Sequence, residues 1–427
     1  MRNILIPCLI FFVTAILSCN GNKKNPDNEQ EGSPIENLEN WLVLPVESRE
    51  PLAQLEFAKK PLSKEQAKST TAKILEDKQA QILSDFGPQW DARLITLGEF
   101  KMPFYYQVFG DEPVDGRSLF ISMHGGGGAP AEVNDQQYKN QQHLYDSVMN
   151  LSEAVYLAPR APTDAWDLWH QDHIDKFFNL LIQLAVIKEK VNPDKVYLLG
   201  YSAGGDGVYQ LAPRMADRFA AASMMAGHPN ETSPLGLKNL PFALHMGALD
   251  SAYERNLKAA QWKAMLDSLE NAAPGTYIHQ VVLHEGMGHW MKLQDAMALP
   301  WMKGFQRNTL PEAVLWKQDD RHHSAFYWLG VPQQSIVTGG EVRADYDSSL
   351  NEINITQNYS DTLQLFMHDN MLNLDKPVTI KYKGQVIFNG KVERTLLNIY
   401  NTIMDKGDAA LSFPAMVSVI NNTEVVK

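Results

Sequence analysis

Three residues that could together carry out acyl transfer occur in a fixed order along the chain: Ser202, Asp250 and His289. A serine hydroxyl is a weak nucleophile, so it needs a histidine to take its proton and a carboxylate to orient that histidine. Ser202 lies in Gly200-Tyr201-Ser202-Ala203-Gly204, a Gly-x-Ser-x-Gly pattern typical of a tight strand-to-helix turn. We therefore predict a nucleophile at Ser202, a general base at His289 and an orienting carboxylate at Asp250.

A second feature is the glycine-rich stretch His124-Gly125-Gly126-Gly127-Gly128. Amides without side chains can approach a substrate oxygen closely, as an oxyanion hole requires. We expect the amides of Gly125 or Gly126, together with that of Ala203, to hold the oxygen that becomes negative during the reaction.

Aromatic and imidazole side chains occur in the loops that should surround the serine. Binding clefts are commonly lined by aromatic side chains with a few polar groups. The predicted substrate-binding residues are Trp166, Trp169, His170, His228 and Trp290. His170 and His173 have a spacing that metal ligands use, but no third ligand is evident, so we predict neither a metal site nor a cofactor.

The elements that must position these residues are short apolar runs of strand type. Such runs at 118–123, 196–201, 241–247 and 281–284 each precede one of the candidate loops. Ligands of open α/β sheets bind beyond the carboxyl ends of the strands, and the order Ser, Asp, His is that of an α/β-hydrolase. We predict an α/β-hydrolase sheet with flanking helices over residues 90–308, preceded by a helical extension at 41–89.

The sequence pattern changes after residue 311. Short β-type runs separated by turns follow one another, interrupted by one helical segment near 394–404. Regularly spaced short strands are typical of a sandwich, so residues 312–427 are predicted to form a C-terminal β-sandwich-like accessory domain.

Composition and charge limit the partners and the location. A formal net charge of −12 over 427 residues argues against nucleic acid as a partner. Residues 1–18 combine an early cation with an apolar run, which predicts a signal peptide. The run ends at Ser18-Cys19, which resembles the lipobox of bacterial lipoproteins. That resemblance implies cleavage, lipidation of Cys19, a polar tether over 19–40 and attachment to the outer membrane of the cell envelope.

The elbow around Ser202, the loop 124–128 and the segment Gly286-Met287-Gly288-His289-Trp290 resemble secreted α/β-hydrolases of the polyhydroxyalkanoate-depolymerase and feruloyl-esterase-like group. The resemblance covers about residues 90–308. It implies a serine hydrolase that cleaves carboxylic esters. Small-acyl or aromatic esters, including esters carried on carbohydrate, are the expected substrates. Two alternatives stay open: a serine peptidase of the same fold, and a non-catalytic, glycan-binding surface lipoprotein.

Overall fold

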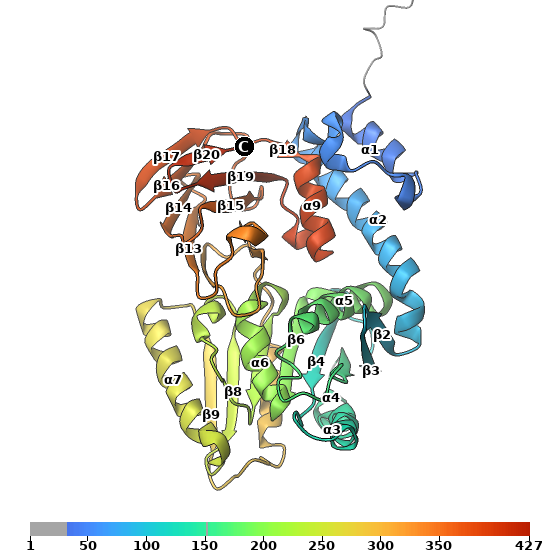
Figure 1. Ribbon diagram of the computed structural model, residues 1–427, viewed down its shortest axis with the longest axis vertical. Coiled ribbons are helices and arrows are strands. Elements are labelled where there is room, and N and C mark those ends of the chain that lie inside the picture. The colour runs from blue at the N-terminus through green and yellow to red at the C-terminus, as the bar shows by residue number, and fades with distance from the viewer. Residues whose placement is uncertain (1–31, 151–152) are drawn as a thin grey trace, which may run out of the picture.

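The computed structural model describes residues 32–150 and 153–427 (Figure 1). The predicted signal peptide and the predicted lipidation site at Cys19 lie outside the described residues. The tether was predicted to reach residue 40, and this boundary was wrong, because helix α1 spans Pro34–Leu42. Ser33 caps the helix by accepting a hydrogen bond from the amide of Glu36, and Leu38 and Trp41 supply the apolar face that a polar tether would lack. No helix in the described ranges has the length and apolar character needed to cross a bilayer.

An eight-stranded sheet forms the centre of the molecule, in the order β2-β3-β5-β4-β6-β7-β8-β9. Its strands are β2 (Leu94–Leu97), β3 (Phe100–Phe109), β4 (Arg117–Met123), β5 (Ala154–Pro159), β6 (Val191–Tyr201), β7 (Ala221–Met225), β8 (Phe242–Gly247) and β9 (His279–His284). The β2–β3 and β3–β5 pairs are antiparallel, and the other pairs are parallel. The chain moves from β4 to one side and then returns past it to β6. The switch point at which an open α/β sheet binds its ligands is therefore between β4 and β6.

Helices cover both faces of the sheet, so the central strands are apolar along most of their length. One face packs against α2 (Lys64–Asp91), α5 (Asp172–Glu189), α6 (Ala203–Arg214) and α7 (Arg255–Ala272). The other face packs against α3 (Ala131–His143), α4 (Asp146–Met149) and α8 (Ala298–Met302). Neighbouring strand residues divide between the two cores: Leu119 and Ile121 face the first, and Phe120 faces the second. The predicted α/β-hydrolase fold is thus confirmed.

The C-terminal unit contains two five-stranded sheets. One has the order β10 (Ala313–Lys317), β13 (Glu341–Asp347), β14 (Glu352–Gln357), β16 (Val378–Tyr382), β17 (Gln385–Gly390). The other has the order β11 (Ala325–Phe326), β12 (Leu329–Gly330), β15 (Thr362–Met367), β19 (Ala415–Ile420), β20 (Glu424–Val426). Both bury alternate side chains, such as Ile353 and Ile355 of β14 and Leu363 and Leu365 of β15, in one shared core. This is the β-sandwich-like arrangement expected from the sequence.

The N-terminal segment packs against the C-terminal unit. Strand β1 (Pro61–Leu62) pairs with β18 (Arg394–Thr395), and α9 (Leu396–Lys406) contacts the first half of α2. Figure 1 shows α2 running along one side of the molecule from the C-terminal unit to the edge of the central sheet. Leu38, Ile74 and Ile399 belong to the small core that this contact buries.

Buried ion pairs complete the junction between the sheet and the C-terminal unit. Arg307 donates to both Asp194 (2.8 Å) and Asp408 (2.7 Å), and His323 contacts Asp175 (2.7 Å). Helix α6 begins beside Ser202 and ends at Arg214, which binds Asp175 at this junction (2.6 Å). A helix of 12 residues is about 18 Å long. The C-terminal unit therefore docks at the end of α6 remote from the serine.

Candidate active site

Ser202 occupies the turn between β6 and α6 with φ +58° and ψ −122°. Non-glycine residues rarely adopt this conformation, which is that of a nucleophile elbow and lifts the side chain above the sheet. The flanking glycines are needed for close approach. A Cβ at Gly200 would lie 2.2 Å from the carbonyl oxygen of Gly204, and one at Gly204 would lie 2.2 Å from that of Met123. The motif thus allows α6 to start directly against β6 and β4.

The structure brings Ser202, His289 and Asp250 into one hydrogen-bonded chain. Ser202 Oγ lies 2.9 Å from His289 Nε2, and His289 Nδ1 lies 2.6 Å from Asp250 Oδ2. Asp250 follows β8 and is buried, whereas His289 follows β9 and is partly exposed. A carboxylate at Nδ1 places the imidazole proton there, which leaves Nε2 free to accept the proton of the serine. The arrangement has the geometry needed for general-base activation of a serine.

Tyr201 fixes the loop that carries His289, a role that the sequence analysis missed. Its hydroxyl donates to the carbonyl oxygen of His289 (2.6 Å) and accepts from the amide of Met291 (3.0 Å). Burial raises the pKa of Tyr201 well above its ordinary value, so the donor proton stays in place. This residue is the first variable position of the Gly-x-Ser-x-Gly motif, and its pattern alone specifies no side chain there.

His124 orients the glycine-rich loop from beneath. Its Nδ1 lies 2.6 Å from the carbonyl oxygen of Gly125, and its Nε2 accepts from the amide of Ala161 (3.1 Å). Burial lowers the pKa of His124 to about 4, so the ring is neutral at pH 7 and carries its proton on Nδ1. The C=O and N–H of a trans peptide point in opposite directions. Because the carbonyl of Gly125 points toward His124, the amide of Gly126 points away from His124.

The predicted oxyanion donors lie beside the serine. A Cβ at Gly125 would be 3.1 Å from Ser202 Cβ, and Ala203 is the first residue of α6, where amides have no intrahelical acceptor. The amide of Gly127, by contrast, donates to Asn134 Oδ1 (2.9 Å). Asn134 is fully buried and also donates to Asp164 (2.8 Å), so it ties the glycine loop to α3.

The substrate-binding prediction was wrong for Trp169 and His170, which are buried. Trp169 donates to the carbonyl oxygen of His124 (2.9 Å) and packs on Gly207, and the carbonyl of His170 accepts from Arg214. In the segment that holds them, Trp166 lies beside Gly127. Trp169 lies further along α6, beside Gly207 and away from the serine. The expectation that a loop after a strand end lies at the active site therefore holds only for the start of this loop.

Of the other predicted substrate-binding residues, Trp290 alone lines the cavity at Ser202. Trp166 is exposed and packs against Gly128, outside that cavity. His228 lies on the opposite flank of α6, where its amide donates to Asp206 (2.6 Å) and its ring contacts Asn230.

The cavity has a volume of about 640 Å³ and is bordered by Ser202 and His289. One wall is a single face of α3, because the lining residues Val133, Gln137, Asn140, Gln141 and Leu144 recur at helical spacing. Tyr201 and Trp290 line another part, and Trp290 is 49% exposed. The described residues that line it include no lysine, arginine or carboxylate. The sequence analysis missed this wall, although the amides at helical spacing just after the glycine loop were a usable signal.

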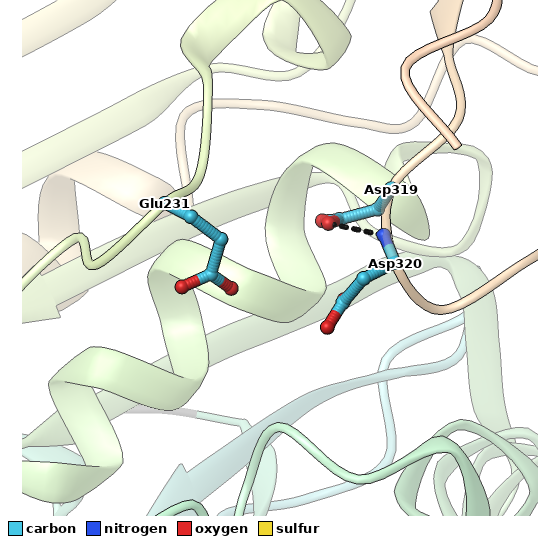
Figure 2. A group of neighbouring side chains, drawn as sticks. All are labelled: Glu231, Asp319 and Asp320. Atoms are coloured by element: carbon cyan, nitrogen blue, oxygen red, sulfur yellow. Dashed lines mark hydrogen bonds between the residues drawn. The ribbon is translucent and has the colours of Figure 1, made fainter.

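Three carboxylates that could ligate a cation lie elsewhere, at the junction with the C-terminal unit (Figure 2). Ligand atoms of Glu231, Asp319 and Asp320 lie within 4.8 Å of one another. Gln210 donates to Glu231 (2.9 Å), and the backbone amide of Asp320 donates to Asp319 (2.7 Å). Acidic residues also gather at surfaces without an ion, so we assign no ion to this group.

No protein-family model matches the chain, and no curated protein sequence does either. Among solved structures, a thermostable esterase is similar over 50% of this chain and 62% of its own, less than two thirds of its length, at 14% identity and a TM-score of 0.40. The acetyl xylan esterase from Aspergillus awamori matches over 47% of this chain and 93% of its own, at 14% identity and a TM-score of 0.36. Est1E from Butyrivibrio proteoclasticus matches over 49% of this chain and 95% of its own, at 16% identity and a TM-score of 0.34. At these values the comparisons assign neither a reaction nor a substrate to this chain.

Proposed function

We propose that this protein is a serine hydrolase that cleaves carboxylic esters through an acyl-enzyme intermediate. The observation that carries the proposal is the hydrogen-bonded chain from Ser202 through His289 to Asp250, set at the switch point of the sheet beside an open cavity. Each member follows a different strand of the same sheet, so the sheet sets the positions of the three side chains relative to one another.

The steps follow from this geometry. Ser202 Oγ attacks the ester carbonyl carbon while His289 Nε2 takes its proton, and Asp250 stabilises the resulting imidazolium. The amides of Ala203 and of Gly125 or Gly126 hold the negative oxygen. When the intermediate collapses, the C–O bond breaks and His289 returns the proton to the alcohol. Water activated by His289 then attacks the acyl-enzyme, which releases the acid and restores the serine.

Ser202→Ala tests the reaction. We expect kcat on a short-chain aryl ester to fall by roughly 10⁴-fold, because a triad without its nucleophile keeps only binding and oxyanion stabilisation. Ser223→Ala is the control, since it removes another buried serine hydroxyl, on β7, and should leave kcat unchanged. Parental activity in Ser202→Ala would refute the assignment. Failure of a fluorophosphonate to label the folded parent would favour the non-catalytic, glycan-binding alternative instead.

Peptidase activity is the alternative within the same chemistry. A triad of this kind also cleaves amides. The lining residues within 32–150 and 153–427 include no lysine, arginine or carboxylate, so they offer no ion pair to a peptide terminus or a charged side chain. We therefore expect turnover of aryl esters to exceed that of dipeptide amides. The reverse ranking, measured as kcat/KM on both panels, would make the protein a peptidase.

Small-acyl or aromatic esters, including those carried on carbohydrate, are the substrates that we propose. Half-exposed Trp290 offers a ring for stacking, and the amides of Gln137 and Asn140 offer neutral hydrogen bonds to a hydroxylated group. An acyl-length series of chromogenic esters is the measurement. Highest kcat/KM on acetyl or feruloyl esters is expected, and a preference for dodecanoyl esters would contradict this substrate class.

A further inference from the structure

The C-terminal unit contains a second cavity, of about 310 Å³, that shares no lining residue with the cavity at Ser202. It lies between α9, the β11–β12 hairpin and strand β15. Its volume is in the range of sites that take small molecules. None of the residues assigned to the hydrolase reaction above borders it.

One wall of this cavity is apolar and partly aromatic. The rings of Phe366 and Phe413 are 5.7 Å apart and tilted by 31°, and Leu411 and Met416 extend the same wall. Phe366 also lies against the backbone of Gly330, where a Cβ would come within 2.7 Å of its ring. Such a wall suits the apolar face of a ring-shaped ligand.

The other walls carry polar groups without partners. Tyr327 is only 2% exposed, yet its hydroxyl makes no hydrogen bond to any residue that the structure describes. The chain holds Tyr327 at φ +51°, a left-handed conformation that costs free energy in a non-glycine residue. The side-chain amides of Gln364 and Asn401 border the same cavity and likewise lack a hydrogen-bond partner within residues 32–150 and 153–427.

Tyr327, Gln364 and Asn401 therefore offer the cavity one hydroxyl and two amides that no described residue engages. A ligand with matching donors and acceptors can bind these groups in place of water. The charged groups at the rim are already engaged. Lys406 Nζ lies 3.2 Å from Asp217 and 3.7 Å from Asp405. The ligand is therefore expected to be uncharged, to carry several hydroxyl groups and to have one apolar face.

We propose that this cavity is a carbohydrate site that takes one or two residues of a neutral sugar. The sugar ring stacks on Phe366 and Phe413, and its hydroxyls bind Tyr327, Gln364 and Asn401. A purely apolar ligand would leave those polar groups buried and unpaired. A charged ligand would have to compete with an existing ion pair, because Lys406 and Asp405, the charged residues among the described lining, contact each other. The site lies on the unit remote from Ser202, so it would hold a polymeric substrate without competing for the serine.

The test is equilibrium binding of unesterified neutral sugars, such as xylobiose, cellobiose and maltose, to the full chain by calorimetry and saturation-transfer NMR. These probes contain no ester bond for Ser202 to cleave. We expect at least one to bind with a Kd of about 1 mM or tighter. Tyr327→Phe and Asn401→Ala should each weaken binding about threefold to tenfold, because each removes one hydrogen bond. Hydrolysis of a soluble aryl ester should be unchanged.

Two matched variants serve as controls. Tyr382→Phe removes a hydroxyl from the other sheet, and Asn370→Ala removes an exposed amide, and neither residue borders the cavity. Both should bind sugar as the parent does. Thermal unfolding of all four variants checks the fold, and Asn401 is exposed, so its truncation leaves the core intact. Three results would overturn the proposal: no neutral sugar binding at about 10 mM, binding that Tyr327→Phe and Asn401→Ala leave unaltered, or stronger binding of octanoate than of any sugar.

Discussion

At the scale of single residues, the most informative side chains are those that position the reacting groups but take no part in the reaction themselves. Tyr201 links the turn before the nucleophile to the loop after β9 through its two hydrogen bonds. His124 and Asn134 hold the glycine loop in the same way. Their effects should appear in kcat and in stability more than in KM.

Tyr201→Phe should lower kcat about fivefold to twentyfold with little change in KM, because the His289 loop loses two hydrogen bonds that set its position. Steady-state kinetics on an aryl ester measures this. Tyr197→Phe is the matched control on the same strand, since Tyr197 donates to the carbonyl of Phe305 (2.9 Å), away from His289. Equal losses of kcat in both variants would show that Tyr201 acts only through general stability.

Trp169→Ala should destabilise the protein by about 3–5 kcal/mol and lower kcat, because it empties a fully buried site and releases the carbonyl of His124. The sequence analysis placed this side chain in the substrate cavity, where its loss would have raised KM. Denaturant unfolding and kinetics separate the two. Trp166→Ala is the control, since that ring is 65% exposed. A raised KM with unchanged stability would contradict the structure.

Asp206 provides a test by pH. Burial raises its pKa from 3.8 to about 6. Because the pKa is higher in the folded state, the contribution of Asp206 to the free energy of unfolding is most favourable below pH 3.8, falls as the pH rises to about 6 and stays low above that. This increase in pKa corresponds to a loss of roughly 3 kcal/mol in the free energy of unfolding between the two pH limits. Asp206→Asn should therefore stabilise the protein at pH 8 relative to the parent and have a smaller effect at pH 4. An equal change in Tm at both pH values would be inconsistent with a buried, titrating carboxyl.

At the scale of elements, the strands that precede the site could be predicted because each is an apolar run ending in a loop of distinctive residues. The fold then follows from the order of those loops. What the sequence does not encode locally is where a loop goes after it leaves the strand. Residues 166–173 follow β5, yet only their start stays near Ser202.

Two further elements show the same limit. The α3 wall was missed because the spacing of its amides indicates one face of a helix but not that this face lies over the serine. Strand β13 has no continuous apolar run, because Glu341, Arg343, Asp345 and Asp347 alternate with its other residues. Only pairing with β10 and β14 makes it a strand.

Gly204→Ala tests the contact between elements that the site depends on. A Cβ there would meet the carbonyl of Met123 at 2.2 Å, so α6 would have to move off β4. We expect a loss of about 3 kcal/mol or more and little activity. Gly87→Ala is the control, because the nearest atom to its Cβ would be a side-chain carbon of Leu83 at 3.9 Å. Gly87 lies inside α2, where alanine is about 1 kcal/mol better than glycine. Parental stability in Gly204→Ala would mean that α6 has more room than this contact allows.

At the scale of the whole molecule, α1 lies beside the C-terminal unit, and the serine lies at the other end of α6. We propose that Cys19 is lipidated, as the resemblance to a lipobox implies, which would attach the membrane anchor on the N-terminal side of α1. Cys19→Ser should move the protein from the detergent phase to the aqueous phase in a partitioning experiment, with the same kcat on a soluble ester. Unchanged partitioning would place the attachment elsewhere.

The pairing of Leu62 with Arg394 also sets an order in time. Strand β1, α1 and the first half of α2 bury their apolar side chains against α9, which the ribosome makes more than 300 residues after Leu62. At translation rates of roughly 5–20 residues per second, these segments wait on the order of half a minute for that partner. Strand β1, α1 and the first half of α2 therefore reach their final contacts only after α9 has been made, and a chain that stops before α9 lacks the partner for their apolar side chains.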